Sequence, residues 1–366
     1  MKKIKLGILI LSNSWGGAEI SIYNLIKHLD RGHFQVYLFV NGYLVKNYSN
    51  LAQVRIVNLG VLESNKKVLK IYTLWGIRQA LLKTLKKNQV DLLHLNLENS
   101  LLIWGMIKGQ LNMPIIFTLR GNETKVYHAP QTLEQRLIRW LLNSMLNDKQ
   151  IRITSVSNWL TKDFSDKARS KIKVIFNGVN CQMFKPNMHD KLIDNQPDGN
   201  KIVFYYGRIV SGKGIEDLIA VAKKLPEYEF WFAGKGPLSS IINLTNTRYL
   251  GFKEQPQLIK LLSQVTICVF PSLSEGFGLV GLESMACGKA IIATQTGFSD
   301  YVDHDQDGLL IESGNRQQLK TAIIRLMEDE IFRKSIEIMA RKKALKYDFS
   351  HTVRNYENLY RKMITK

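Results

Sequence analysis

A glycine-containing segment in the second half of the sequence carries two cations suited to binding an anion. It runs from Gly207 to Gly214 (GRIVSGKG) and contains Arg208 and Lys213. An apolar segment precedes it and a segment of helical period follows, so the unpaired amides of a helix start would lie beside both cations. This pattern is typical of a diphosphate site. The alternative is a loop between a strand and a helix whose cations are simply solvated.

A second segment, Ser274–Glu283 (SEGFGLVGLE), carries two carboxylates around another helix start. Glu275 precedes the expected helix and Glu283 lies inside it, so both can face one ligand. A carboxylate accepts two hydroxyl donors at once, which suits the vicinal diols of ribose or a hexose. The glycines allow backbone to approach a ligand, and the helix start offers amides to a phosphate. The alternative is a capping acid followed by a surface glutamate.

The first half carries weaker candidates. Ser14–Glu19 (SWGGAE) is a glycine turn that opens a helix, but it lacks the G-x-G-x-x-G pattern, so dinucleotide binding is not favoured. His94 and Asn96 end one apolar run, and Arg120 and Asn122 follow another. We expect these four to line the acceptor side of a site. The alternative for His94 is a purely structural hydrogen bond.

The elements that must position these residues follow an α/β pattern. Short apolar runs alternate with segments of helical period, which indicates parallel sheets. The expected strands are 4–11, 34–40, 90–95, 114–119, 151–156 and 173–176, then 201–206, 229–233, 248–250, 266–270 and 290–293. The expected helices are 18–29, 68–87, 132–146 and 158–165, then 215–224, 255–263, 279–286 and 316–326.

The 366 residues are too many for one typical domain and suit two doubly wound domains facing across a cleft. We expect an N-terminal Rossmann-like domain over 1–184, a linker over 185–200 and a second such domain over 201–348. The linker is rich in Pro, Asn and Asp. Residues 349–366 complete the chain.

The basic charge lies mainly in the first half of the chain. Residues 1–180 hold 26 Lys and Arg against 10 Asp and Glu, and residues 181–366 hold 25 against 21, which gives +16 and +4 of the total of +20. Such a field favours an anionic partner or is merely solvated. The stretch 66–87 mixes Leu and Ile with Lys and Arg, as in a helix lying on an anionic membrane or an ordinary surface helix. No nucleic-acid module is evident.

Three further features limit the class of protein. No run of about 18 apolar residues occurs, so we expect no membrane span. The N-terminal apolar run is short and leads into Ser12 and Asn13 without a cleavage pattern, so a buried strand is favoured over a signal peptide. The cysteines are few and scattered, which fits a reducing compartment and packing roles: Cys181, Cys268 and Cys287.

Together these segments resemble the retaining glycosyltransferases of family 4, which have the GT-B fold, and the likeness covers nearly the whole chain. Glu275 and Glu283 match the family's E-x7-E motif. One departure is Arg120, because many relatives carry a His in the loop after that strand. The other matching segments are Gly16–Glu19, Val174–Asn180 (VIFNGVN) with Phe184 and Pro186, Gly207–Gly214, Phe232–Pro237 (FAGKGP) and Ala286–Ala290 (ACGKA).

The resemblance implies roles for these residues. Arg208 and Lys213 would neutralise the departing diphosphate, Glu275 would contact the transferred sugar, and Glu283 would hold the ribose. Arg208, Lys213 and Glu275 would form the catalytic set. The closing helix, 352–363, would cross back to the N-terminal domain. The remaining donor-binding residues would be Gly17, Phe277, Gly278, Leu279 and Val280, with no metal or other cofactor.

The resemblance also implies an activity. We expect a retaining transferase that moves a hexose or N-acetylhexosamine from a nucleoside-diphosphate sugar to a saccharide or lipid-linked acceptor, in bacterial cell-surface polysaccharide or lipopolysaccharide synthesis. We expect a protein that is cytoplasmic or peripheral at the inner face of the cytoplasmic membrane, without nucleic acid as partner. The alternatives are a sugar-nucleotide epimerase of the same architecture and a non-catalytic basic membrane-binding protein.

Overall fold

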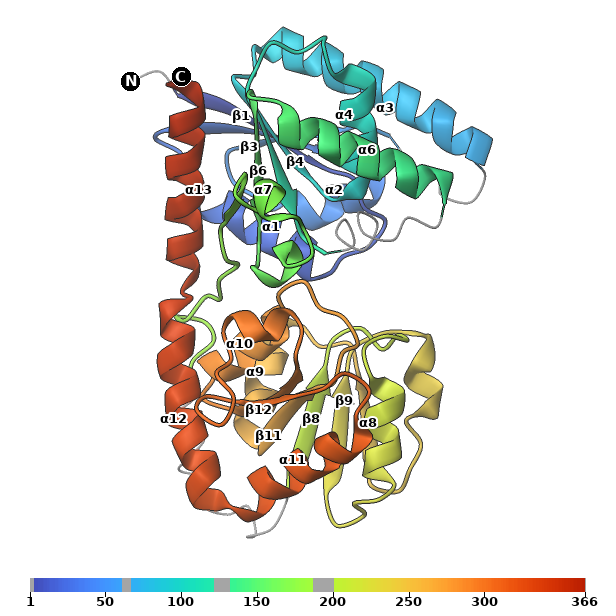
Figure 1. The fold of residues 1–366 in the computed structure, drawn as a ribbon, viewed down its shortest axis with the longest axis vertical. Coiled ribbons are helices and arrows are strands. Elements are labelled where there is room, and N and C mark those ends of the chain that lie inside the picture. The colour runs from blue at the N-terminus through green and yellow to red at the C-terminus, as the bar shows by residue number, and fades with distance from the viewer. Residues whose placement is uncertain (1–2, 61–66, 122–131, 187–200, 366) are drawn as a thin grey trace. The chain divides into compact units, whose positions relative to one another are not determined.

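The chain divides into two compact units in a computed structural model that describes residues 3–60, 67–121, 132–186 and 201–365 (Figure 1). Unit 1 comprises Met1–Asn177 and Ser350–Lys366, and unit 2 comprises Gly178–Phe349. Most of the expected linker, 187–200, and the candidate Asn122 lie outside the described residues.

Unit 1 is built on a seven-stranded parallel sheet in the order β3-β2-β1-β4-β5-β6-β7. The central strands are apolar runs buried on both faces, as parallel sheets require. The chain builds outward from β1 to β3 and then returns to place β4 on the other side of β1, so the strand order reverses there. The bounds are β1 Ile4–Ile10, β2 Phe34–Val40, β3 Val54–Asn58, β4 Leu92–Asn96, β5 Ile115–Leu119, β6 Ile151–Ser155 and β7 Ile172–Val174.

Helices connect these strands, and α6 shows why one of them begins where it does. The Thr132 hydroxyl accepts a hydrogen bond from the Gln135 amide at 3.2 Å, which caps the helix start. Its apolar stripe, Ile138, Leu141, Leu142 and Met145, is buried. The unit 1 helices are α1 Gly17–His28, α2 Gly42–Tyr48, α3 Lys67–Asn88, α4 Glu98–Ile107, α6 Leu133–Asn147, η1 Trp159–Thr161, α7 Asp166–Arg169 and α13 Phe349–Ile364.

The closing helix α13 packs into unit 1, although it follows unit 2 in the sequence (Figure 1). Its hydroxyl groups anchor it: Thr352 donates a hydrogen bond to the Phe176 carbonyl at 2.9 Å. Tyr356 and Tyr360 are at most 1% exposed and face the sheet. The last helix is therefore part of the core of unit 1.

Unit 2 repeats the architecture with a six-stranded parallel sheet in the order β10-β9-β8-β11-β12-β13. Here the strand order reverses between β8 and β11, so the loops after these two strands are neighbours. The strands are β8 Ile202–Tyr206, β9 Glu229–Ala233, β10 Thr247–Gly251, β11 Ile267–Phe270, β12 Ala290–Thr294 and β13 Leu309–Ile311. The helices are α8 Ile215–Ala222, η3 Pro237–Ile241, α9 Gln255–Gln264, α10 Leu279–Ala286, η4 Gly297–Asp300, α11 Arg316–Glu328 and α12 Glu330–Lys346.

These two sheets, each covered by helices, match the doubly wound α/β class expected from the sequence. Among the described residues, every helix is too short or too polar to cross a bilayer.

Candidate active site

The loops after β8 and β11 form one connected structure at the carboxyl edge of the unit 2 sheet. The Leu273 amide donates a hydrogen bond to the Gly212 carbonyl at 2.9 Å. Gly214 has a φ of +71°, and a Cβ there would overlap the Pro271 carbonyl. Glycine is needed at this position both for its conformation and for the close approach of the two loops. In doubly wound sheets this edge is where ligands bind.

Lys213 and Glu275 meet between these loops. The Lys213 ammonium forms a hydrogen-bonded ion pair with Glu275 Oε1, and their side chains are 16% and 17% exposed. The Ser272 hydroxyl donates a second hydrogen bond to the same oxygen at 3.2 Å. Two residues chosen separately from the sequence are therefore in direct contact, and both retain access to solvent.

Arg208 lies at the start of the β8 loop. Its side chain is exposed, and its carbonyl accepts a hydrogen bond from the Tyr205 hydroxyl at 2.8 Å. Burial raises the pKa of the Tyr205 phenol, with Glu275 adding to this rise and Arg208 opposing it. The charges of Arg208 and Glu275 thus both act on Tyr205, which lies beneath the loop. Arg208 and the Lys213–Glu275 pair therefore lie at the same edge of the sheet.

Glu283 lies inside α10, on the other side of the β11 loop. The Tyr206 hydroxyl is 3.4 Å from its Oε2 and donates a better hydrogen bond to the Val280 carbonyl at 2.7 Å. Glu283 keeps some exposed surface, yet the loss of water around its carboxyl raises its pKa to about 8, against a small lowering by Tyr206. Among the residues that the structure describes, the Tyr206 hydroxyl is the one hydrogen-bond donor to this carboxylate, and its bond is long. Hydroxyl groups of a ligand would therefore stabilise the ionised form.

The first turn of α10 offers backbone amides to the same edge. Gly278 is the residue before the helix, with a φ of +77°. Leu279 and Val280 follow it, are partly exposed, and begin the helix, where amides have no intrahelical acceptor. Phe277, expected among the donor-binding residues, is 3% exposed, and its ring centroid lies 5.1 Å from that of Tyr301, so the ring does not face a ligand. It orders the loop from inside.

The predicted site residues of the first half belong to unit 1. Gly17 is the first residue of α1 and is exposed. Glu19 is 4% exposed and accepts a hydrogen bond from the Gly16 amide at 3.0 Å, which caps the helix. The glycine turn therefore opens a helix as its sequence indicates.

His94, Asn96 and Arg120 come together at the carboxyl ends of β4 and β5, but inside the unit. All three are at most 8% exposed. Arg120 Nε donates a hydrogen bond to Asn96 Oδ1 at 2.9 Å, and its Nη1 donates to the Ser21 hydroxyl at 3.2 Å. Ser21 in turn donates to Asn177 Oδ1 at 2.7 Å. The sequence does not single out Ser21, and it marks Asn177 only as part of the segment 174–180, because nothing local connects positions so far apart.

The His94 ring is enclosed by protein. Its Nδ1 lies 2.8 Å from the Tyr360 hydroxyl and its Nε2 lies 2.7 Å from Thr118 Oγ1. Burial, assisted by Arg120, holds its pKa well below the usual range, so the ring is neutral. This environment matches the structural alternative for His94. A direct contact with an acceptor does not fit a ring with no exposed surface.

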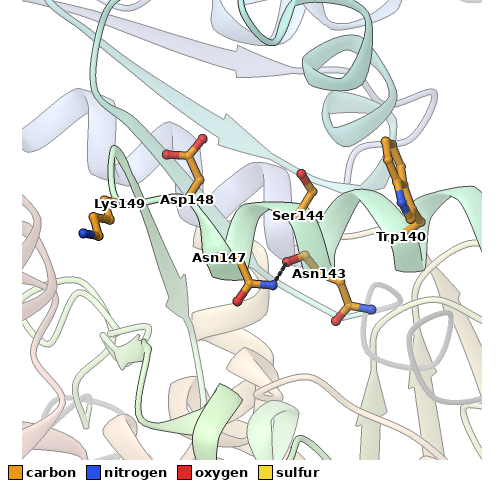
Figure 2. Close-up of a pocket in the computed structure, with 6 residues that line it drawn as sticks. All are labelled: Trp140, Asn143, Ser144, Asn147, Asp148 and Lys149. Atoms are coloured by element: carbon orange, nitrogen blue, oxygen red, sulfur yellow. Dashed lines mark hydrogen bonds between the residues drawn. The ribbon is translucent and has the colours of Figure 1, made fainter.

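An open hollow of about 750 Å³ lies elsewhere, along α6 and the turn after it. Its six lining residues spread along the helix without converging on one point, and the hydrogen bond between Asn147 and Asn143 is internal to the helix (Figure 2). The six are Trp140, Asn143, Ser144, Asn147, Asp148 and Lys149, and none is a predicted site residue. Chemistry is better supported at the carboxyl edge of the unit 2 sheet.

Known proteins match this chain along most of its length. The family model described as "Glycosyltransferase Family 4" matches residues 15–183, and "Glycosyl transferases group 1" matches residues 189–343. An uncharacterized glycosyltransferase of Methanocaldococcus jannaschii is 26% identical over 357 residues, 95% of each chain.

Two further comparisons bear on the fold and the family. An N,N'-diacetylbacillosaminyl-diphospho-undecaprenol alpha-1,3-N-acetylgalactosaminyltransferase of Campylobacter jejuni is 28% identical over 65% of this chain and 68% of its own. The solved structure of Anabaena HepE with UDP-glucose superposes with a TM-score of 0.80 at 22% identity, over 97% of this chain and 99% of that one. The two parallel-sheet units therefore form a GT-B fold. With both family models matching in order, the chain belongs to the group 1 glycosyltransferases and is a glycosyl-transferring enzyme.

Proposed function

We propose that the enzyme moves a hexose or N-acetylhexosamine from a nucleoside-diphosphate sugar to a saccharide or lipid-linked acceptor, with retention of anomeric configuration. The observation that carries this proposal is the contact of Lys213 with Glu275 at the sheet edge where Arg208, Glu283 and the start of α10 also lie. Cations and helix amides suit a diphosphate, and carboxylates suit sugar hydroxyls.

The transfer is an exchange at the anomeric carbon. Its bond to the diphosphate oxygen breaks, and the electron pair leaves with the diphosphate. An acceptor hydroxyl oxygen then bonds the anomeric carbon, and its proton passes to the departing diphosphate. Arg208 and Lys213 stabilise the negative charge that develops on the leaving group, each contributing about 3 kcal/mol if they act like other preorganised donors. Glu283 binds the ribose, and Glu275 contacts the transferred sugar.

We propose that this reaction needs no metal ion, because fixed cations and helix amides supply the positive charge beside the diphosphate. The site residues would then suffice for donor binding. Turnover that is unchanged in excess EDTA is the expected result. Loss of turnover in EDTA with recovery on addition of Mg²⁺ or Mn²⁺ would overturn this part of the proposal.

A panel of donors tests the nucleotide site. Melting temperature is measured with UDP-, GDP-, ADP- and dTDP-sugars, since a ligand that binds the folded state raises it. We expect one nucleotide class to raise the melting temperature of the wild type, and Arg208→Ala and Glu283→Ala to lose that rise while remaining folded. Arg325→Ala is the matched control, because Arg325 pairs with Asp305 on the surface. A wild type that responds to no nucleotide, or site variants that keep the response, would contradict the assignment.

The stereochemical course needs its own measurement. When the acceptor is in hand, NMR of the product from an α-linked donor should show an α-linked glycoside. A β-linked product would mean an inverting enzyme.

For the acceptor, we propose a lipid-linked or polysaccharide substrate of bacterial envelope synthesis, at the inner face of the cytoplasmic membrane. The name of the Campylobacter jejuni relative describes transfer to a diphospho-undecaprenol-linked sugar. The first 180 residues carry a charge excess of +16, from 26 Lys and Arg against 10 Asp and Glu. On α6, Leu133, Leu137 and Trp140 are exposed along one stripe. A basic surface with exposed Leu and Trp suits an anionic bilayer.

Vesicle sedimentation tests the membrane contact. We expect binding to vesicles containing anionic lipid at low salt, loss of binding in about 0.5 M salt, and little binding to zwitterionic vesicles. Absent binding, or binding that is indifferent to salt, would contradict the proposal.

A further inference from the structure

The segment after β12 holds the loop that carries Glu275 at two points. The Gly297 amide donates a hydrogen bond to the Glu275 carbonyl at 3.2 Å. Four residues further along, the Tyr301 hydroxyl donates to the Gly278 carbonyl at 2.5 Å. The loop runs from Pro271 to Gly278, so one short segment fixes it at two points, Glu275 in its middle and Gly278 at its end. We name Gly297, Phe298 and Tyr301 the aromatic clamp.

Side-chain packing makes this contact specific. A Cβ on Gly278 would overlap the Phe298 ring, and a Cβ on Gly281 would overlap both the Tyr301 hydroxyl and that ring. A Cβ on Gly297 would overlap the backbone of Gly276. Three glycines thus let the clamp approach the backbone more closely than any side chain would permit.

The aromatic clamp is itself buried and held by contacts with α12. Phe298 and Tyr301 are 0% and 1% exposed. Behind them, the Tyr347 hydroxyl at the end of α12 donates to the Asp300 carbonyl at 2.8 Å. Lys343 on α12 pairs with Asp303 at 2.5 Å. Helix α12 therefore supports the clamp from behind, and the clamp supports the loop.

The aromatic clamp acts on the amides at the start of α10 through Gly278. Its carbonyl accepts the first helical hydrogen bond, from the Gly281 amide at 3.0 Å, as well as the hydroxyl of Tyr301. The peptide plane at Gly278 sets the direction of the first turn of α10, and buried carbonyls with two donors are well fixed.

We propose that Tyr301 is a positioning residue for the donor diphosphate: acting through the Gly278 carbonyl, its hydroxyl holds the first turn of α10 in the orientation that receives phosphate. This inference rests on the proposed function, because it concerns the same nucleotide site. Tyr301 does not itself touch the ligand.

The test uses Tyr301→Phe, which removes the hydroxyl and keeps the ring in its packing. Tyr228→Phe is the matched control, since the buried Tyr228 also donates to an acceptor, Glu328, but precedes β9 and lies at the opposite end of the sheet. The first readout is hydrogen–deuterium exchange of the peptide 275–283 in the free full-length protein. We expect faster exchange in Tyr301→Phe and no change in Tyr228→Phe.

The second readout is donor affinity, measured by calorimetry with the nucleotide that most stabilises the wild type in the donor panel. We expect Tyr301→Phe to weaken binding about three- to tenfold, the worth of one hydrogen bond, and to raise KM while kcat changes less than twofold. Equal exchange and equal affinity in Tyr301→Phe and wild type would overturn the inference.

The two readouts separate the inference from the proposed function. Faster exchange supports positioning by Tyr301 even when the wild type binds no nucleotide, and that second result would defeat the proposed function alone. A normal nucleotide response in the wild type, with wild-type exchange and affinity in Tyr301→Phe, would defeat the inference alone.

Discussion

Lys213 and Glu275 are 62 residues apart in the sequence and form a direct ion pair with both side chains mostly buried. The pair exists because β8 and β11 are adjacent in the sheet although β9 and β10 lie between them in the chain. In the proposed reaction Lys213 serves the diphosphate and Glu275 the sugar. A bound donor therefore has to break this ion pair or contact both side chains while they remain paired. In the free protein the ion pair occupies the site.

The stability of this pair can be measured with a double-mutant cycle. Lys213→Met and Glu275→Gln should each lower the free energy of unfolding by about 1–3 kcal/mol, between the effects for exposed and buried pairs, because each leaves a partly buried charge without its partner. The double variant should lose less than the sum. The measurement is urea unfolding.

The control for this cycle is the pair of Glu330 and Lys334 on α12, whose side chains are 61% and 66% exposed. Its coupling should be at most about 0.5 kcal/mol. Strictly additive effects of the Lys213 and Glu275 substitutions would mean that the contact contributes nothing to stability.

Glu283 should make stability depend on pH. Its pKa in the folded protein is about 8, above the ordinary value of 4.5, because burial disfavours the charge. The folded state thus holds the proton more tightly than the unfolded state, and this contribution to stability is lost as pH rises from about 4.5 to about 8. Glu283→Gln stays neutral, so its melting temperature relative to the wild type should increase between pH 5 and pH 8.5.

Glu330→Gln is the control for that series. Contact with Lys334 lowers the pKa of Glu330, so its substitution should give no relative gain as pH rises. A melting-temperature difference between Glu283→Gln and wild type that stays flat across this range would show that the Glu283 carboxyl titrates normally.

Alanine substitutions at two glycines of the β8 loop can distinguish the cost of backbone strain from the cost of steric overlap. Gly212 and Gly214 both have positive φ, at +84° and +71°. A Cβ on Gly212 meets no atom of the described residues within 4 Å, whereas one on Gly214 overlaps the Pro271 carbonyl. Gly212→Ala should cost about 1 kcal/mol, from conformation alone. Gly214→Ala should cost about 2–4 kcal/mol, since the loops must also move apart.

Denaturant unfolding of both alanine variants gives these values, and the donor panel adds a functional readout. Gly214→Ala should also weaken nucleotide binding, because it displaces the neighbouring Lys213. Equal destabilisation by the two substitutions would mean that the approach of the β8 and β11 loops is not tight in solution.

Apolar runs and turn glycines were enough to predict most of the elements around the site. The segment expected at 201–206 is β8 at Ile202–Tyr206, and the helix expected at 279–286 is α10 at those bounds. Missed elements have weak or unusual patterns. β3, at Val54–Asn58, is a half-exposed edge strand. After Glu98, Asn99 and Ser100, α4 is apolar and has no polar face to mark its period. α12 buries a stripe made partly of alanine, Ile336, Ala340 and Ala344.

Residue type alone singled out the candidate site, whereas its contacts could not be predicted from the sequence. Arg208, Lys213, Glu275 and Glu283 stand out as types that bind anions and hydroxyls. Their neighbours depend on strand order, which is a property of the whole sheet. The aromatic clamp shows this clearly: nothing in the residues 297–301 indicates that they hold the Glu275 loop, because that contact exists only once β12 pairs with β11.

His94 should contribute to stability in a pH-dependent way. Its ring is buried between Tyr360 and Thr118, and its pKa lies well below the usual range. The folded state favours the neutral ring, so this stabilisation is full above about pH 6.5 and declines as pH falls below that value. His94→Gln should lower the free energy of unfolding by about 2–4 kcal/mol at pH 8. The loss should be smaller at pH 5, because the glutamine has no proton to gain.

Urea unfolding at both pH values measures this loss of stability. The control is His351→Gln, because His351 is exposed on α13. A His94→Gln variant as stable as the wild type at pH 8 would contradict the structural role and would favour the direct acceptor contact instead.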